Sequence, residues 1–509
     1  MTPATSFESF QPLYDQGRPQ LLWTKLVADL ETPVSAMLKL ADGKPNSIFL
    51  ESVEGGAQRG RYSFIGLKPD VIWRCHGDAA ELNRSASHNP DGFAPCPVSE
   101  KKGALASLRA LVKESTIEDM PASLPPMAAG LVGYMGYDMV RLVEPVKDAD
   151  KPRFDLPDGL FLRPTVMAIF DNVDDSVTLA TPVRPRAGID ARAAYSMACE
   201  RLADLVSDLD RSLPSLPASD VSAAISAEPK TNMTEAEYCA MVEKAKEYIN
   251  AGDIFQVVLS QRMTVPFKLP PFALYRSLRR TNPSPFMVYL DFGHFALVGS
   301  SPEILVRLRG GKVTVRPIAG TRPRGADESA DIAYAADLLS DPKELAEHLM
   351  LLDLGRNDVG RVARTGTVSV TERNIIERYS HVMHIVSNVE GMLDSDKYDA
   401  MDALFAGFPA GTVSGAPKVR AMQIIEELEP DRRGPYAGCI GYFSANGSLD
   451  TCITLRTGLV KDGELHIQAG AGIVADSVPA SEHQECRNKA RALLRAAEDA
   501  VKFAGRRRG

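Results

Sequence analysis

Three glycine-containing dipeptides separate short runs of alternating apolar residues in the second half of the chain, and they constrain the fold more than any other feature. They are Gly310-Gly311, Asn446-Gly447 and Asp462-Gly463. Such dipeptides favour the tight turns of β-hairpins, and alternation of apolar with polar residues is typical of strands that have one face in a core. The sequence therefore predicts an antiparallel sheet made of consecutive hairpins.

The first of these turns predicts the position of an acidic side chain. A two-residue turn at Gly310-Gly311 joins strands over 304–308 and 313–318 and places Glu303 opposite Ile318. Glu303 then lies next to Gly320 and Thr321. A carboxyl group is thus expected beside a turn of the backbone that contains glycine.

The other two turns predict a meander that gathers polar side chains. A two-residue turn at Asn446-Gly447 makes Tyr436 and Arg456 diagonal neighbours, and the turn at Asp462-Gly463 brings Arg456 beside the stretch 470–472. That stretch is Gly470, Ala471 and Gly472, and glycine in a strand lets a ligand approach the backbone. The alternative is that these glycines serve only sheet curvature or a bulge.

A helix followed at once by a strand precedes these hairpins. Thr234 and Glu237 form a capping box, and apolar residues then recur at helical spacing until Gly252. The strand predicted over 254–260 places Gln256 on one face together with Val258. An amide among apolar neighbours needs a hydrogen-bond partner.

Two further segments carry acidic residues at helical spacing. One is 343–352, with Glu347, and the other begins at Pro479 and has Glu485 and Lys489 on one face. Solvated glutamate faces are common, so this pattern alone leaves a metal site and a plain surface open. Mg²⁺ takes one or two protein carboxylates together with water and an anionic substrate, which suits one glutamate from each helix.

Length and composition limit the domain organisation. A chain of 509 residues suggests about two to four domains. The segment 212–231 is rich in Ser, Ala and Pro without apolar periodicity, as in a linker. We therefore predict domains over 1–225 and 226–509, with strands at 47–50 and 62–65 in the first, and allow strands of the two domains to share sheets.

Charge and cysteine content exclude several classes of function. The 58 Lys and Arg against 66 Asp and Glu give a formal net charge of −8, which does not favour nucleic acid or anionic lipid as a partner. No signal peptide or membrane segment is expected, since the uncharged stretch 120–137 contains prolines and glycines. Seven cysteines without a CxxC pair indicate buried thiols in a reducing cytoplasm.

Six segments carry a family resemblance in the same order along the chain. They are IAGTRPRG (318–325), KELAEHLMLLDLGRND (343–358), SHVMHIVSNVEG (380–391), SGAPKVRAM (414–422), GYFSANGSLDTCITLR (441–456) and QAGAGIVADSVPASEHQECRNKA (468–490). The chain resembles the chorismate-utilising enzymes from Ser47 to about Ala500, and within that family the anthranilate synthase large subunits. The resemblance implies an α+β fold, a sandwich of large, mostly antiparallel sheets flanked by helices, and tryptophan biosynthesis as the setting.

The same resemblance implies a cofactor and a substrate site. Mg²⁺ is expected to hold the ring carboxylate of chorismate, with Glu347 and Glu485 as the matching ligands. The positions that match chorismate-binding residues are Gly320, Thr321, Tyr436, Arg456, Gly470, Ala471 and Gly472, with Lys489 as a further candidate. A guanidinium such as that of Arg456 suits a carboxylate because it can bond both oxygens.

Three catalytic residues also follow from the resemblance. Glu303 matches the acid that protonates the departing C4 hydroxyl, which requires a raised pKa. Gln256 stands where water-adding relatives have a lysine base, so ammonia rather than water is the expected nucleophile at C2. His384 matches the position associated with elimination of pyruvate.

The source of ammonia implies a partner. The only segment resembling a glutaminase nucleophile turn, around Cys439, lies in a predicted strand and is expected to be core. A separate glutamine amidotransferase subunit is therefore implied, in a tetramer with two copies of each chain.

An inhibitor site for L-tryptophan is implied as well, formed by residues from both parts of the chain. The matching positions are Ser52, Pro285, Phe286, Met287, Ile440, Gly441 and Tyr442. Phe286 replaces a tyrosine often found there, which removes one hydroxyl. The alternative is that these residues only pack between domains.

Single positions argue against two rival functions. Aminodeoxychorismate synthases commonly carry a lysine at the position of Ala319, and alanine has no nucleophile to offer. A non-catalytic tryptophan-binding relative would be expected to have lost catalytic positions, whereas Glu303, Glu347, Arg456 and Glu485 are all present.

Overall fold

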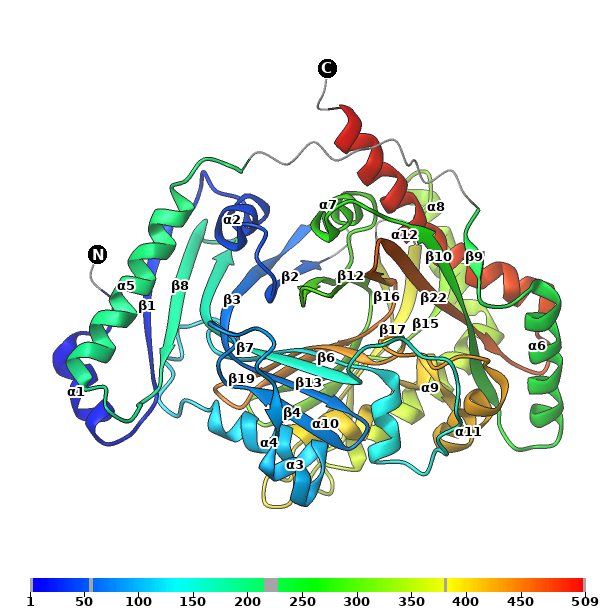
Figure 1. Cartoon of the computed structure of the whole chain (residues 1–509). Helices are drawn as coiled ribbons and strands as arrows, with labels where there is room; N and C mark the ends of the chain where they lie inside the picture. Colours follow the sequence, from blue (N-terminus) through cyan, green and yellow to red (C-terminus); the bar gives the residue numbers. More distant parts are fainter. Residues whose placement is uncertain (1–2, 55–57, 215–227, 380–381, 507–509) are drawn as a thin grey trace.

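The computed structural model describes residues 3–54, 58–214, 228–379 and 382–506 (Figure 1). Helices account for much of the surface. They are α1 (Phe7–Asp15), α2 (Pro33–Ala41), α3 (Pro97–Lys102), α4 (Ala104–Glu114), α5 (Ala191–Leu209), α6 (Glu235–Asn250), α7 (Pro271–Thr281), α8 (Glu328–Ser340), α9 (Pro342–Gly360), α10 (Ala400–Gly407), α11 (Lys418–Leu428) and α12 (Pro479–Arg506), with 3₁₀ turns η1 (Tyr137–Leu142) and η2 (Gly411–Val413).

The strands fall into three groups along the chain. The first group is β1 (Gln20–Val27), β2 (Ser47–Glu54), β3 (Gln58–His76), β4 (Ala79–Asn83), β5 (Ala94–Pro95), β6 (Gly130–Met135), β7 (Gly159–Asp171) and β8 (Ser176–Val183). The second is β9 (Lys230–Thr231), β10 (Gln256–Pro266), β11 (Phe286–Asp291), β12 (Phe295–Ser301), β13 (Ile304–Arg309), β14 (Lys312–Val315) and β15 (Ile318–Pro323). The third is β16 (Ser369–Arg378), β17 (Val382–Met392), β18 (Gly415–Ala416), β19 (Cys439–Ser444), β20 (Leu449–Ile453), β21 (Thr457–Lys461) and β22 (Glu464–Ile473).

The pairings between these strands are antiparallel and form two series that meet at the long strands β3 and β7. One series runs β3, β2, β11, β12, β21, β22 and β10. The other runs β7, β6, β19, β20, β13, β14 and β17. The expected α+β class, with large antiparallel sheets flanked by helices, is confirmed.

Both series mix strands from the two halves of the sequence. Strand β2 pairs with β11, and β6 pairs with β19. The core is shared in the same way, since buried Ile48 and Ile440 belong to one apolar cluster. The proposed boundary near residue 225 lies outside the described residues, and the hydrogen-bonded sheets cross it in space.

Helices cover the sheets at both ends of the molecule. Figure 1 shows α1 and α5 beside β1 and β8 at one end, and α6 and α11 at the other.

The predicted capping box of α6 is present, because the Thr234 hydroxyl accepts from the backbone N–H of Glu237 and the Glu237 side chain accepts in return from the backbone N–H of Thr234. Within the described residues, no helix has both the length and the apolar character needed to cross a membrane.

The register predicted for the first hairpin is correct near the turn and wrong further along. Arg307 pairs with Thr314, as the Gly310-Gly311 turn requires. Strand β14 then ends at Val315, and Ile318 starts β15 and pairs with Val386 instead of lying opposite Glu303. Pro317 lies between the two strands, and a proline cannot donate to the ladder.

The register predicted for the second hairpin is wrong by one residue. Ser444 donates to the carbonyl of Ser448, so the loop has three residues, and Gly447 adopts a positive φ of 84°. Cys439 consequently pairs with Ile453, and Ala437 donates to Thr454 rather than pairing with Arg456. The third hairpin is as predicted, because Lys461 pairs with Glu464.

Candidate active site

The pairing of β10 with β22 brings an amide and a phenol against the glycine-containing stretch. Gly472 leaves room for Gln256, since a Cβ on this glycine would lie 2.4 Å from Gln256 Nε2. Gly470 leaves room for Tyr436 in the same way, since a Cβ there would lie 2.8 Å from the phenol oxygen. The absence of a Cβ at both glycines thus lets these two side chains approach β22 closely, while the predicted approach of a ligand to this stretch stays a prediction.

Carboxylates from α9 and α12 gather beside Gln256. Gln256 Nε2 lies 3.5 Å from Glu347 Oε1. The pKa of Glu347 is raised first by burial and then by the negative charges of Glu344 and Glu485. On α12, Lys489 Nζ lies 2.8 Å from Glu485 Oε1 and donates to the carbonyl of Gly470 at 2.8 Å.

This acidic group fits a hard divalent cation by its chemistry. Mg²⁺ prefers oxygen ligands, and its positive charge relieves the mutual repulsion of carboxylates that lie close together. Among the described residues, no three His, Cys, Asp or Glu side chains converge closely enough to form a metal cluster on their own. Such a cation would accordingly keep water or substrate oxygens as further ligands.

Glu303 lies in a separate, drier part of the site. Its side chain is buried, and burial raises its pKa to about 8. The Thr412 hydroxyl donates to both carboxyl oxygens at 3.1 and 3.2 Å, and the charge of Arg456 also favours ionisation. These two neighbours only partly offset burial, so Glu303 holds its proton at neutral pH.

Arg456 faces Glu303 from a strained backbone position. Its φ is 47°, in the left-handed region, and its carbonyl accepts from the backbone N–H of Ser300. Burial lowers the pKa of the guanidinium, while Tyr379 and Glu303 oppose that change. Tyr436 and Arg456 both reach the site although the register that was expected to join them is absent.

His384 is held against the Gly320 turn. Its Nδ1 lies 2.8 Å from the carbonyl of Gly320 and 3.2 Å from the Thr321 hydroxyl. Burial lowers its pKa to about 4, so the imidazole is neutral and Nδ1–H donates to Gly320 while Nε2 keeps its lone pair. Gly320 itself needs glycine, because its φ is 66°.

Thr412, Tyr379 and a buried ion pair are parts of the site that sequence reasoning missed. Arg433 donates to Glu429 at 2.6 and 2.9 Å, and its side chain is 1% exposed. It also donates to the carbonyls of Val413 and Val258, each at 2.7 Å. The spacing of four residues between Glu429 and Arg433 was a signal, but only the structure shows that the pair joins the Thr412 turn to β10.

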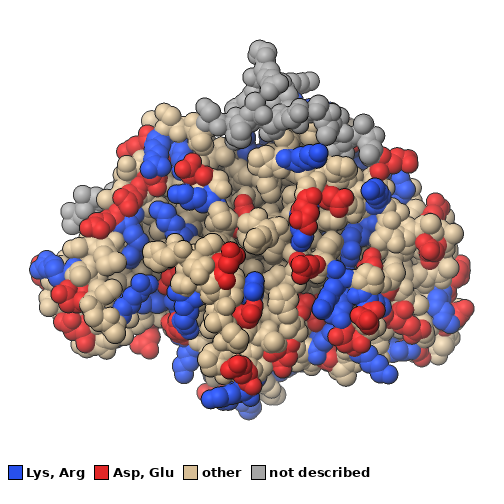
Figure 2. Space-filling model, in the orientation of Figure 1, with Lys and Arg blue, Asp and Glu red and all other residues tan. Residues whose placement is uncertain are grey.

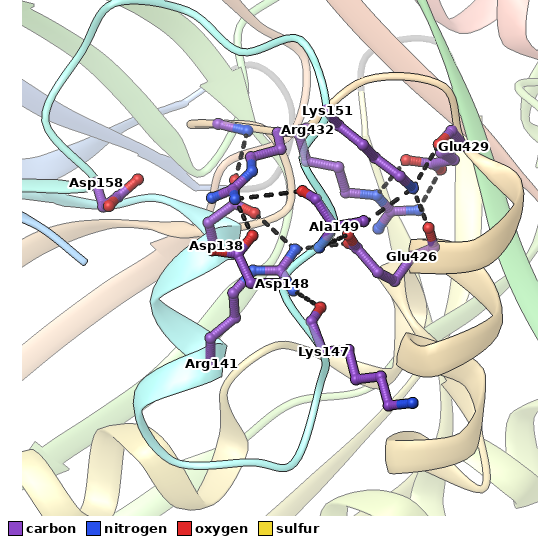
Figure 3. A network of polar contacts seen from close by, with 12 residues as sticks. Asp138, Arg141, Lys147, Asp148, Ala149, Lys151, Asp158, Glu426, Glu429 and Arg432 are labelled. Atoms are coloured by element: carbon purple, nitrogen blue, oxygen red, sulfur yellow. Dashed lines mark hydrogen bonds and ion pairs between the residues drawn. The ribbon is translucent and has the colours of Figure 1, made fainter. Parts of the chain in front are cut away.

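Further polar contacts surround this ion pair and join it to the first half of the chain (Figure 3). Arg141 donates to Glu426 at 2.6 Å, and Lys151 donates to the carbonyl of Glu429 at 2.6 Å. Arg432 bonds to Asp148. The loop after η1, from the first half of the chain, is thereby tied to the end of α11 next to the site.

The positions expected for an inhibitor line a cavity of about 280 Å³ between β2, β11 and β19. Ser52, Phe286, Met287, Ile440, Gly441 and Tyr442 line it, whereas Pro285 does not. Charged side chains line it as well, among them Glu51 and Arg309. Cys452, on the same wall, pairs with Ile304, the residue after Glu303.

The site thus combines a buried carboxyl with a raised pKa, a buried guanidinium and an acidic group around a glycine-containing strand. The model of the chorismate binding enzyme family matches residues 73–495. The chain therefore belongs to the chorismate binding enzymes. The expected family is confirmed.

Relatives within the family are similar over the whole chain. Anthranilate synthase component 1 of Cereibacter sphaeroides is 58% identical over 502 residues, which is 99% of each chain. That of Pseudomonas aeruginosa is 48% identical over 92% of this chain and 94% of its own.

Solved structures agree with this assignment. Anthranilate synthase component I of Streptococcus pneumoniae is similar with a TM-score of 0.73 and 35% identity, covering 85% of this chain and 92% of its own. The menaquinone-specific isochorismate synthase of Escherichia coli shares the fold with a TM-score of 0.68 at 20% identity, covering 95% of each chain.

Proposed function

We propose that this chain is the large subunit of an anthranilate synthase, which converts chorismate and ammonia to anthranilate, pyruvate and water. The observation that carries the choice of nucleophile is the identity of residue 256: a neutral amide cannot deprotonate water, so the attacking molecule must already be a nucleophile, as ammonia is. Gln256 Oε1 is a buried acceptor with no hydrogen-bond partner among the described residues, and it can accept an N–H of ammonia. Because Gln256 Nε2 faces Glu347, the amide is oriented with its carbonyl free for such a donor.

The first step, the replacement of the C4 hydroxyl by an amino group at C2, uses both parts of the site: Gln256 on one side and Glu303 on the other. Ammonia attacks C2, both ring double bonds shift by one bond toward C4, and the C4 hydroxyl leaves as water after taking a proton from Glu303. The ammonium group formed at C2 then releases one proton to solvent. The pKa of Glu303, about 8, suits a group that must be protonated near neutral pH and still give up its proton. Gln256 orients the nucleophile and cannot act as a base toward water.

The second step removes pyruvate from the aminated intermediate. Loss of the C2 proton and of the enolpyruvyl group at C3 makes the ring aromatic. His384 offers a neutral Nε2 with a lone pair, because its Nδ1–H is engaged with Gly320. We assign it to this proton transfer.

Substrate binding is assigned to the residues around β22. Arg456 and Lys489 supply positive charge for carboxylates, Tyr436 supplies a hydroxyl, and the backbone of Gly320, Thr321, Gly470, Ala471 and Gly472 supplies close approach. Glu347 and Glu485 would hold Mg²⁺, which would neutralise the ring carboxylate of chorismate.

Regulation and assembly complete the proposal. L-tryptophan is assigned to the 280 Å³ cavity, and ammonia is assigned to a glutamine amidotransferase partner in a tetramer of two copies of each chain. Cys439 supports a separate glutaminase, since it is 1% exposed in the core of β19. The domain limits 1–225 and 226–509 and a cytoplasmic location stay predictions.

The test uses the full chain with chorismate and Mg²⁺, first with ammonium at alkaline pH and then with glutamine. We expect anthranilate fluorescence and pyruvate in equal amounts with ammonium and neither with glutamine. An aminated product without pyruvate would instead indicate an aminodeoxychorismate synthase. Saturating L-tryptophan should suppress turnover, and unchanged turnover would overturn the inhibitor site alone.

A further inference from the structure

A small cavity at the other end of the molecule from α6 lies between α5, the end of β8 and the paired strands β3 and β7. Figure 1 shows α5 and β8 at the end of the molecule opposite α6. The cavity has a volume of about 50 Å³. Its polar lining, which we call the arginine pocket, is Tyr14, Asp70, Thr165, Arg184, Arg186 and Arg201.

The negative charge near the arginine pocket is already used. Asp70 accepts from Arg163 Nε at 2.7 Å and from Arg163 Nη2 at 2.9 Å. Glu114 accepts from Arg163 at 2.8 Å and from both terminal nitrogens of Arg84. Arg84 and Arg163 thus already balance the negative charges of Asp70 and Glu114, without any contribution from the arginines of the arginine pocket.

The pocket arginines have no such match. Among the described residues, neither Arg184 nor Arg201 has a carboxylate within 4.0 Å, and Arg186 reaches Asp70 only at 3.8 Å. Arg184 Nε is buried and finds no hydrogen-bond partner in the described part of the chain. Arg184 and Arg201 are half-buried, and positive groups that lie close together with limited access to water are stabilised by a counter-ion.

The titration of these groups agrees with the geometry. Burial, together with the positive charge of Arg163, lowers the pKa of Arg184 to about 10. Burial also lowers the pKa of Arg201, followed by repulsion from Arg186. A bound anion would oppose both decreases in pKa, because it favours the charged form of each guanidinium.

We propose that the arginine pocket binds a small oxyanion, either inorganic phosphate or the phosphate group of a metabolite. Guanidinium groups hold such oxygens with paired N–H donors. Arg201 Nε donates to the Thr181 hydroxyl, and Arg184 Nη2 donates to the carbonyl of Ser115. The other N–H groups of these two side chains can donate to the anion. The volume exceeds the roughly 10–15 Å³ that a single water needs on the same measure.

The access route supports a group that enters from solvent. The Arg186 side chain is 61% exposed, whereas Arg184 is only partly exposed and its Nε is buried. A phosphate on a larger molecule can therefore enter past Arg186 with the rest of that molecule outside. The site is independent of the chorismate site and of the proposed function.

Binding is tested by calorimetric titration of the full chain in a phosphate-free buffer, with inorganic phosphate and glycerol 3-phosphate as probes and chloride at equal ionic strength as reference. We expect the wild-type chain to bind a phosphate probe and Arg201→Gln to bind it about tenfold more weakly or worse, as for a lost hydrogen bond to a charged group. Arg192→Gln removes a charge from the exposed face of α5, where Arg192 lies over Phe7, and should bind like wild type.

The two probes distinguish the source of the anion. Binding of both supports free phosphate or a phosphate group, and tight binding of the ester alone supports a metabolite. Heat effects equal to those of chloride, or equal affinities of wild type and Arg201→Gln, would overturn the proposal.

A stability measurement separates binding from a structural role. Arg201→Gln removes repulsion but also the hydrogen bond to Thr181, so its melting temperature without phosphate is taken as the baseline, and added phosphate should raise the melting temperature of wild type more than that of the variant. A variant that melts lower by the same amount with and without phosphate would show that Arg201 is structural only.

Discussion

Replacing Thr412 by valine should raise the pKa of Glu303 still further. The Thr412 hydroxyl donates to both Glu303 oxygens and thereby favours the ionised carboxylate. A hydrogen bond to a charged group contributes roughly 1.5–3 kcal/mol, and each pKa unit corresponds to about 1.36 kcal/mol. We therefore expect the pKa of Glu303, about 8 in the native chain, to rise by roughly one to two units.

The assay is the pH dependence of anthranilate formation at a constant concentration of free ammonia. An acid that must be protonated gives an alkaline limb where activity falls, and that limb should move to higher pH in Thr412→Val. Thr412→Ser keeps the hydroxyl and should keep the limb in place. An alkaline limb that does not move, or that moves to lower pH, would refute the assignment of Glu303 as the acid.

The same carboxyl group should make stability depend on pH. Its pKa is higher in the folded chain than the ordinary value of 4.5, so between pH 4.5 and about 8 the folded state binds more protons than the unfolded state. The contribution to stability is complete below pH 4.5 and is lost as the pH rises toward 8. The full difference amounts to roughly 5 kcal/mol, and Glu303→Gln should remove this dependence.

Three further substitutions test other parts of the site. Gln256→Lys should shift the product from an aminated to a water-derived compound, as detected by mass spectrometry, and anthranilate at an unchanged rate would contradict the role of Gln256. Gly470→Ala places a Cβ 2.8 Å from the Tyr436 hydroxyl oxygen and 2.9 Å from the backbone carbonyl oxygen of Leu259, so KM for chorismate should rise by about tenfold and the melting temperature should fall; an unchanged KM would argue against close approach there. Glu429→Gln leaves a buried guanidinium unpaired and should cost about 3–5 kcal/mol in denaturant unfolding, whereas the exposed Glu247→Gln should cost less than about 1 kcal/mol; equal losses would show that the buried pair is not special.

Local signals in the sequence predicted the elements well and the registers only in part. The capping box at Thr234 and the turn at Asp462-Gly463 act within a few residues, so they could be read directly. The loop around Asn446 closes with three residues instead of two, and the dipeptide alone does not distinguish these loops. A slip of one residue changes which side chains face each other, although it left Tyr436 and Gly470 together.

The parts of the site that could not be predicted depend on contacts distant in sequence. Thr412 meets Glu303 across 109 residues, and Arg433 meets the Val258 carbonyl across 175. Charge also gives little guidance, because basic and acidic side chains are interspersed on the face drawn in Figure 2. Only burial distinguishes the Glu429–Arg433 pair from the many exposed pairs, and burial is a property of the fold.

Glu303 and Glu347 both have raised pKa values, but the causes differ, and the difference separates their roles. For Glu303 the cause is burial, with no neighbouring carboxylate among its main influences, so it stays protonated whatever cation binds elsewhere. For Glu347 part of the cause is repulsion from Glu344 and Glu485, which a divalent cation would reverse. Mg²⁺ binding should therefore lower the pKa of Glu347 and leave the alkaline limb due to Glu303 unchanged. A limb that moves with Mg²⁺ concentration would mean that the acid belongs to the Glu347 group instead.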